Sequence, residues 1–149
     1  MWQQLIHNQM LITALAAWFL SGLLKLPIEY ISTKKWNLGL FFAPGGMPSA
    51  HSALVTATML SVGLYDGFNT AAFVIAFTLM MVVLYDAAGV RRQAGYHAEK
   101  INAIINALLD GDPISGEELN EVLGHTPREV IAGVFTGALI AISIWLFWH

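Results

Sequence analysis

Long apolar stretches separated by short polar connections dominate the chain. Four stretches contain no Lys, Arg, Asp or Glu, and each is long enough to hold a membrane-spanning helix: residues 1–24, 36–65, 67–85 and 130–148. The last stretch gives about 28 Å of helix at about 1.5 Å per residue, close to the hydrocarbon thickness of a bilayer. The pattern predicts an all-α integral membrane helical bundle with about four transmembrane spans.

Turn residues and small residues refine this picture. A run rich in Gly and Pro at 44–48 interrupts the second stretch, so its helix is expected to begin near Ser49. Gly133 and Gly137, four residues apart in the last stretch, have the spacing typical of close packing between membrane helices. The second span is therefore expected to begin near Ser49, and the fourth span is expected to pack closely against another helix.

Amphipathic helices are expected between the third and fourth spans. Apolar residues recur at helical spacing over residues 98–109, which predicts a helix lying at the membrane interface or against the bundle. Ser115 with Glu118 three residues later has the pattern of a capping box, and it predicts a short helix that ends at Gly124.

Composition supports a membrane protein. Only 11% of the residues are charged, against roughly 25% in an ordinary soluble domain, and the mean hydropathy is +0.61. A net charge of -3 offers no basic surplus for nucleic acid, and the lack of cysteine excludes disulfides and thiol catalysis. The length fits a single membrane-embedded domain over residues 1–149.

The basic residues indicate the orientation of the bundle. All seven fall after the first and third spans or at the start of the fourth: Lys25, Lys34, Lys35, Arg91, Arg92, Lys100 and Arg128. The positive-inside rule then places both termini outside and the polar connections in the cytoplasm. Leaving out Lys25 and Arg91, which are candidate phosphate ligands, keeps five basic residues on that side and none opposite. We expect a protein of the cell (inner) membrane.

Ionisable residues gather at this same face of the predicted bundle. His51 begins the second span, Asp86 ends the third, and His125 and Glu129 open the fourth. Such groups at the ends of apolar helices often mark functional sites in membrane proteins, although terminal charges also reach toward lipid headgroups without further function. An active site on the cytoplasmic face is the functional interpretation.

Two local patterns favour phosphate chemistry, and each has a structural alternative. Gly46 and the start of a helix at Ser49 would let backbone N–H groups approach an anion, but Ser49 can equally be an N-cap. His125 and Glu129 lie four residues apart, so the carboxylate can fix the histidine tautomer. Glu129 also completes a capping box with Thr126, which predicts the start of the last span.

The segments GGMPSAHSA, YDAAGVRRQAG and GHTPREVIAGVFTG closely resemble the divergent branch of the phosphatidic acid phosphatase type 2 superfamily. The resemblance covers nearly the whole chain. The run 48–51 matches the superfamily's Pro-Ser-Gly-His motif with alanine for glycine, and His125 with Glu129 is similar to its His-x3-Asp motif. The arginine that usually precedes this histidine is replaced by Leu119, so an arginine after the third span would supply the guanidinium.

The resemblance implies a metal-independent lipid phosphatase without cofactors. His125 would attack phosphorus, Glu129 would hold its other ring nitrogen, and His51 would protonate the leaving group. The phosphoryl oxygens would be held by side chains or backbone amides of Lys25, Gly46, Ser49, Ala50, Arg91 and Arg92. From charge and spacing, we add that Asp86 can orient Arg91.

Several alternatives stay open on the sequence. The chain could be a non-catalytic binder, carrier or scaffold for lipid phosphates, and His51, His125 and Glu129 could instead be metal ligands. Isoprenoid phosphates, phosphatidate and phosphatidylglycerol phosphate all fit as the lipid phosphate. The expected partners are this lipid and the bilayer, with a possible homodimer. The connection at 25–44, with its aromatic residues, is a candidate interfacial flap.

Overall fold

The structure, a computed structural model, describes residues 2–43, 45–108 and 125–148, without the side chains of residues 90–92, 94, 103 and 106–108. Its elements are α1 (Trp2–Ile6), α2 (Gln9–Thr33), the 3-10 turn η1 (Leu38–Phe41), α3 (Ala50–Tyr65), α4 (Ala71–Tyr85), the π-helical turn η2 (Asp86–Val90), α5 (Arg91–Leu108) and α6 (Pro127–Phe147). No strand occurs in the part of the chain described, and the all-α membrane bundle is confirmed. The short helix expected before Gly124 lies outside the described residues.

Within the described part of the chain, three helical segments are long and apolar enough to cross a membrane. They are Gln9–Thr33, Ala71–Gly89 and Pro127–Phe147. The apolar helix α3 has 16 residues, about 24 Å of helix against a hydrocarbon core of about 30 Å. It begins at the N-cap Ser49, as the breaker run predicts, and it ends before Gly67, whose φ of +111° suits a glycine.

The first spanning helix lies further along the chain than the sequence predicts. Asn8 caps α2 through its side chain, and the helix continues through Pro27 to Thr33. Lys25 therefore lies inside the helix and not in the connection that follows, which corrects the prediction. The prediction ended the span at the first charge, but burial of the lysine inside the bundle lets the helix continue.

Small residues bring α2, α3 and α6 into close contact. Ala17, Ala57 and Ala141 form the centre of the core. A Cβ atom at Gly133 would collide with the carbonyl oxygen of Ser49, and one at Gly137 would collide with that of Ala53. The predicted packing role of the two glycines is confirmed, because a larger residue at either position would push α6 away from α3.

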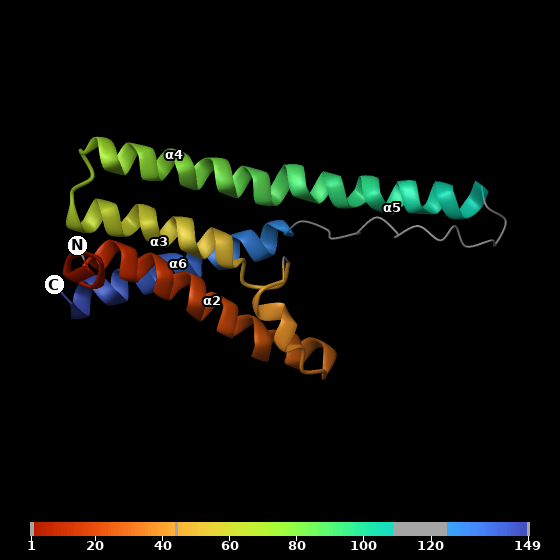
Figure 1. Ribbon diagram of the computed structural model, residues 1–149, viewed down its shortest axis with the longest axis horizontal. Helices are drawn as coiled ribbons and strands as arrows, with labels where there is room; N and C mark the ends of the chain where they lie inside the picture. The colour runs from red at the N-terminus through yellow and green to blue at the C-terminus, as the bar shows by residue number, and fades with distance from the viewer. Residues whose placement is uncertain (1, 44, 109–124, 149) are drawn as a thin grey trace.

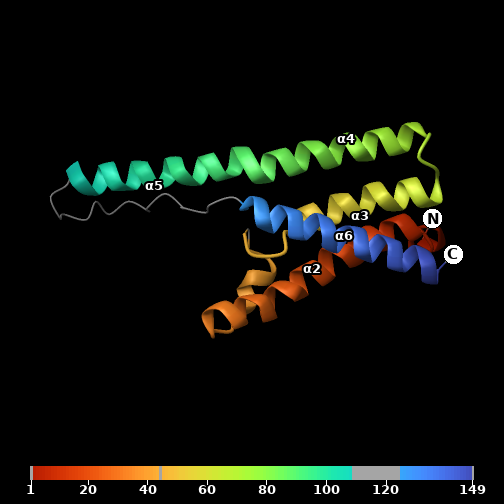
Figure 2. The same cartoon turned by 180° about the vertical axis from the view of Figure 1, so that it is seen from behind.

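Helices α4 and α5 form one long rod that runs past the ends of α3 and α6 (Figures 1 and 2). The segment between them contains no proline, and it passes through the π-helical turn η2 without a loop. Residues 98–108 of the expected amphipathic helix form the outer part of α5, which continues α4, and residue 109 lies outside the described part of the chain. The placement of this helix at the membrane interface stays a prediction.

Both termini lie at the same end of the bundle (Figure 1). The side chain of Gln9 donates a hydrogen bond from Nε2 to the carbonyl oxygen of Trp148, at 2.8 Å. The first turns of α3 and α6 lie toward the opposite end, and so does the end of α2 (Figures 1 and 2). Polar residues from three helices can therefore meet there.

Candidate active site

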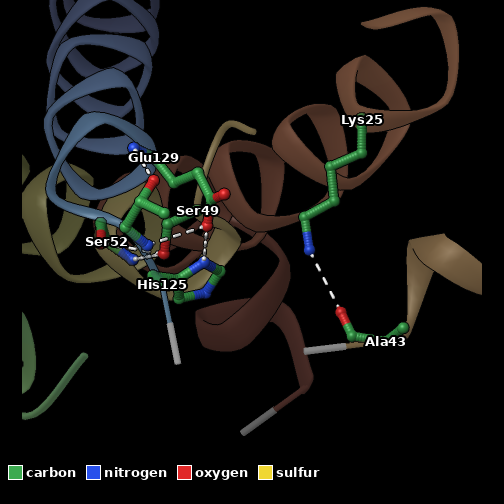
Figure 3. A network of polar contacts seen from close by, with 7 residues as sticks. Lys25, Ala43, Ser49, Ser52, His125 and Glu129 are labelled. Carbon is green, nitrogen blue, oxygen red and sulfur yellow. Dashed lines mark hydrogen bonds and ion pairs between the residues drawn. The ribbon is translucent and has the colours of Figure 1, made fainter. Parts of the chain in front are cut away.

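A histidine and a glutamate form the centre of the site. His125 precedes α6 and is only 5% exposed. Its Nδ1 lies 3.0 Å from Oε2 of Glu129, on the first turn of α6 (Figure 3). Because a carboxylate oxygen only accepts, Nδ1 carries the proton of this bond and Nε2 of the neutral ring keeps its lone pair.

The capping box expected at the start of α6 is also present. The backbone N–H of Glu129 donates to Oγ1 of Thr126 at 3.4 Å, and the N–H of Thr126 donates to Oε2 of Glu129 at 3.2 Å. The same carboxylate oxygen thus accepts from the helix cap and from the imidazole. Glu129 therefore makes both the predicted capping box with Thr126 and the predicted hydrogen bond with His125. The cap holds the carboxylate in place for the histidine.

The second histidine faces the first across the ends of two helices. His51 is the second residue of α3 and is exposed. Its ring centroid lies 6.5 Å from that of His125, with the ring planes inclined by 59°. The rings belong to segments more than 70 residues apart in sequence. Both imidazoles therefore border one space at the same end of the bundle.

Backbone and hydroxyl contacts lock the first turns of α3 and α6 together. Ser49 donates its backbone N–H to the carbonyl oxygen of Glu129 at 3.0 Å. Its hydroxyl oxygen accepts from the N–H of Ser52 at 3.3 Å and from the Ser52 hydroxyl at 2.9 Å (Figure 3). Ser49 has no exposed surface and Ala50 is 5% exposed. The capping role of Ser49 is confirmed, and contact of either residue with a phosphate stays a prediction.

Lys25 brings a positive charge toward the site from a third helix. It is 3% exposed, and its ammonium donates a hydrogen bond to the carbonyl oxygen of Ala43 at 3.3 Å (Figure 3). Helix α2, which carries Lys25, packs against α6, which carries Glu129 on its first turn. A lysine buried in a spanning helix is costly unless it has partners, which favours a functional role.

The glycine-rich loop before α3 lies against this lysine. Gly45 and Gly46 have φ angles of +88° and +80°, which side chains rarely tolerate, and the peptide bond between Met47 and Pro48 is cis. A Cβ atom at Gly46 would lie 3.7 Å from Cδ of Lys25. The loop therefore passes close to the lysine side chain, and contact of Gly46 with a phosphate stays a prediction.

Other predicted ligands are less fully described. Helix α5 begins at Arg91, and the side chains of Arg91 and Arg92 lie outside the described part of the chain. Asp86 begins η2, and this turn packs against α6. The predicted contacts of both arginines, and the action of Asp86 on Arg91, stay predictions.

The alternative of a metal site finds no support in this geometry. Among the described residues, no group of three or more His, Asp or Glu side chains gathers closely enough to hold a metal ion. His51, His125 and Glu129 thus do not form the cluster that the metal interpretation requires.

Sequence reasoning missed two parts of the site. The Ala43 carbonyl that holds Lys25 has no signal in the sequence, because every residue carries a carbonyl and only the path of the connection brings this one near. Ser52 could have been found, since it lies three residues after Ser49 on the same side of a helix. Both contribute to the position of predicted site residues.

Comparison with known proteins identifies the family. Residues 6–140 match the family described as the divergent PAP2 family. The chain belongs to this family. It is also 35% identical, over 97% of its own length and 98% of the relative's, to the uncharacterized membrane protein YuiD of Bacillus subtilis (strain 168). No solved structure matches the chain. The match to a membrane protein agrees with the membrane bundle.

Proposed function

We propose that this divergent PAP2 protein is a membrane lipid phosphatase that hydrolyses a phosphomonoester or diphosphate headgroup without a metal ion. The observation that carries the proposal is the His125–Glu129 hydrogen bond of 3.0 Å, with the ring of His51 facing His125 across 6.5 Å. One histidine has a fixed tautomer and a free nitrogen, and the other stands where a leaving group would depart.

In the first step, Nε2 of His125 attacks phosphorus and a P–N bond forms as the P–O bond to the lipid breaks. His51, as an imidazolium, donates its proton to the departing oxygen, so the lipid leaves as a neutral alcohol or as a protonated phosphate ester. The carboxylate of Glu129 stabilises the positive charge that develops on the His125 ring. The lipid product stays in the bilayer.

In the second step, water hydrolyses the phosphohistidine. The neutral His51 removes a proton from water as its oxygen attacks phosphorus, the P–N bond breaks, and the electron pair returns to Nε2 of His125. Inorganic phosphate leaves, and His51 is again protonated for the next cycle. A positioned general acid and base of this kind typically contributes about 10²- to 10⁴-fold to the rate.

Positive charge and backbone dipoles support binding of the phosphoryl group. Lys25 carries the buried ammonium, and the first N–H groups of α3 point out of the helix end that bears His51. Arg91 and Arg92, which are predicted phosphate ligands, would add guanidinium donors to the equatorial oxygens of the transferring phosphoryl group. Donors of this kind are commonly worth about 10²- to 10³-fold each in rate.

The location of the site favours a lipid as substrate. His51 lies at the start of α3, and His125 and Glu129 lie at the start of α6. A lipid phosphate keeps its chains in the hydrocarbon and its headgroup at the interface, so the headgroup reaches the helix ends without leaving the bilayer. The exposed Lys34 and Lys35 follow α2 at the end of the bundle away from both termini (Figure 1), which supports a cytoplasmic site in the cell membrane.

The proposal is tested with purified protein in vesicles that contain phosphatidate or an isoprenoid phosphate. We expect release of inorganic phosphate that orthovanadate inhibits, since vanadate mimics five-coordinate phosphorus. His125→Ala is expected to abolish release. The matched control is His7→Ala, because this histidine lies near the N-terminus and bonds to the Gln3 carbonyl oxygen.

Unchanged turnover in His125→Ala would overturn the nucleophile assignment. Saturable binding of the lipid phosphate by the unaltered protein, with no phosphate release, would instead indicate the non-catalytic binder or carrier. Leu119, where the superfamily pattern has arginine, is the feature of the sequence that favours this second function.

A further inference from the structure

The connection between α2 and α3 carries exposed aromatic and basic side chains beside the candidate site. Trp36 is 64% exposed, Leu38 72% and Phe42 79%. Lys34 and Lys35 are exposed next to them. Figures 1 and 2 show this connection in orange, at the end of α2 that lies away from both termini. Large apolar side chains exposed together in this way mark an interaction surface.

The inner side of the connection is firmly attached to α2. The ring of Phe41 lies against Gly22, where a Cβ atom would come within 2.8 Å of it. The same ring meets Trp18 and Phe19 edge-on, with centroids 5.6 Å away in each case. These contacts hold the connection against the helix, so its outward side chains are presented at a fixed place.

Charge decides which partner fits the outer side. Lys34 and Lys35 follow the last turn of α2, and Lys34 Nζ lies 6.0 Å from the ring centroid of Tyr30, which stacks on Trp36 at 4.7 Å. The acidic residue nearby on α2 is Glu29, which leaves a surplus of positive charge. Lysine together with aromatic rings at the end of a spanning helix is typical of the membrane interface.

We infer that residues 34–42, which we term the docking segment, seat in the headgroup layer of an anionic leaflet. Trp36, Leu38 and Phe42 enter the boundary between headgroups and acyl chains. Lys34 and Lys35 contact lipid phosphates, and each lysine near such a surface favours the docked state by roughly fivefold. The occupant of this surface is the lipid leaflet itself.

Docking of this segment also determines how deep in the membrane the candidate site lies. Ala43 directly follows the segment, and its carbonyl oxygen accepts the hydrogen bond from Lys25 at 3.3 Å. An anchored segment therefore holds the Lys25 ammonium close to the level of the lipid phosphates. The inference concerns a surface outside the two histidines, and it does not depend on the proposed hydrolysis.

A single fluorescent label tests the docking segment, because the chain contains no cysteine. Phe42→Cys is labelled with an environment-sensitive dye and reconstituted in vesicles of phosphatidylcholine alone or mixed with phosphatidylglycerol. We expect a blue-shifted emission that nitroxide lipids labelled near the headgroup quench more than those labelled at the chain end. The control is Phe135→Cys, which is 65% exposed in the middle of α6 and should show the reverse order.

The contribution of the two lysines is tested with further variants in the same assay. Lys34→Gln with Lys35→Gln in the Phe42→Cys background should reduce the response to phosphatidylglycerol by roughly fivefold per lysine. A label that aqueous iodide quenches and lipid nitroxides do not would overturn the inference, and so would a label shielded from both, which indicates a protein partner or a second copy. Because the assay measures no turnover, failure of the proposed hydrolysis leaves its result unaffected.

Discussion

At the scale of single residues, Glu129 has two functions that sequence reasoning treated as alternatives. Its Oε2 accepts from the backbone N–H of Thr126 at 3.2 Å and from Nδ1 of His125 at 3.0 Å. The cap fixes the carboxylate, and the fixed carboxylate fixes the imidazole. A residue that stabilises a helix end thus also orients a neighbouring histidine.

Glu129→Gln separates the two functions, because glutamine also completes a capping box while it removes the negative charge. We expect an unchanged melting temperature and a loss of phosphate release of about 10²- to 10³-fold, since the developing imidazolium loses its counter-charge. Glu99→Gln, at an exposed position on α5, is the control. Retention of full activity in Glu129→Gln would remove the carboxylate from the proposed mechanism.

Lys25 is expected to be unfavourable for stability and necessary for binding. Lys25 is 3% exposed, and a buried charge costs free energy that one carbonyl does not fully offset. Lys25→Met keeps much of the stem that packs near Gly46. We expect an equal or higher melting temperature, together with an apparent KM raised about 10- to 100-fold by the loss of a charged hydrogen bond.

The matched control for this prediction is Lys100→Met, since Lys100 is exposed on α5. Thermal unfolding in detergent and initial rates over a range of lipid phosphate concentrations check both parts. A lower melting temperature with an unchanged KM would mean that Lys25 supports only the fold.

At the scale of elements, the crossing of α3 and α6 determines how the two histidines face each other. His51 lies on the first turn of α3, and His125 directly precedes the cap of α6. The hydrogen bond from the Ser49 N–H to the Glu129 carbonyl oxygen joins the two helix starts at 3.0 Å. Gly133 lies beside Ser49, so its missing side chain sets how closely the helices approach. Packing one turn below the site thus controls the spacing of the rings.

Gly133→Ala would place a methyl group against the carbonyl oxygen of Ser49, and α6 must shift outward. We expect activity to fall by up to about 10²-fold, because a displacement near 1 Å misaligns the reacting groups. Gly137→Ala meets Ala53 in the same way one turn further from the histidines. It should cause similar destabilisation with a smaller loss of activity, and equal losses would argue against a positioning role for Gly133.

At the scale of the whole molecule, four apolar helices run alternately up and down and leave both termini at one end (Figure 2). The candidate site and the docking segment lie toward the other end. Helices α2, α3 and α6 pack through small residues, whereas α4 contacts α3 and exposes most of its large apolar side chains. That surface is appropriate for contact with lipid.

The orientation of the bundle can be measured with single cysteines. Positive charge at the site end predicts termini outside the cell. A membrane-impermeant maleimide should label Trp2→Cys in intact cells, and it should label Lys35→Cys only after the membrane is opened. The reverse pattern would place the site outside, and labelling of both in intact cells would contradict the antiparallel arrangement.

The limits of sequence reasoning are clear at particular residues. Ser49 as the cap of α3 and Thr126 as the cap of α6 were predictable, because capping depends on neighbours within one turn. The end of α2 was not predictable in this way. The prediction ended the helix before its first charged residue, Lys25, but other parts of the chain bury this lysine and the helix continues. The continuity of α4 and α5 was also missed. A loop was expected after the third span, but the π-helical turn η2 joins the two helices there, and no sequence pattern marked this turn.

The sequence by itself determined the membrane class, the helical fold, the caps and the residues with suitable chemistry, because these follow from composition and from spacing within single helices. Only the tertiary structure decided that the rings of His51 and His125 lie 6.5 Å apart, and that the Ala43 carbonyl oxygen accepts the hydrogen bond from Lys25. Those relations join residues far apart in the chain. They depend on how closely α3 and α6 approach, which the absence of a side chain at Gly133 permits.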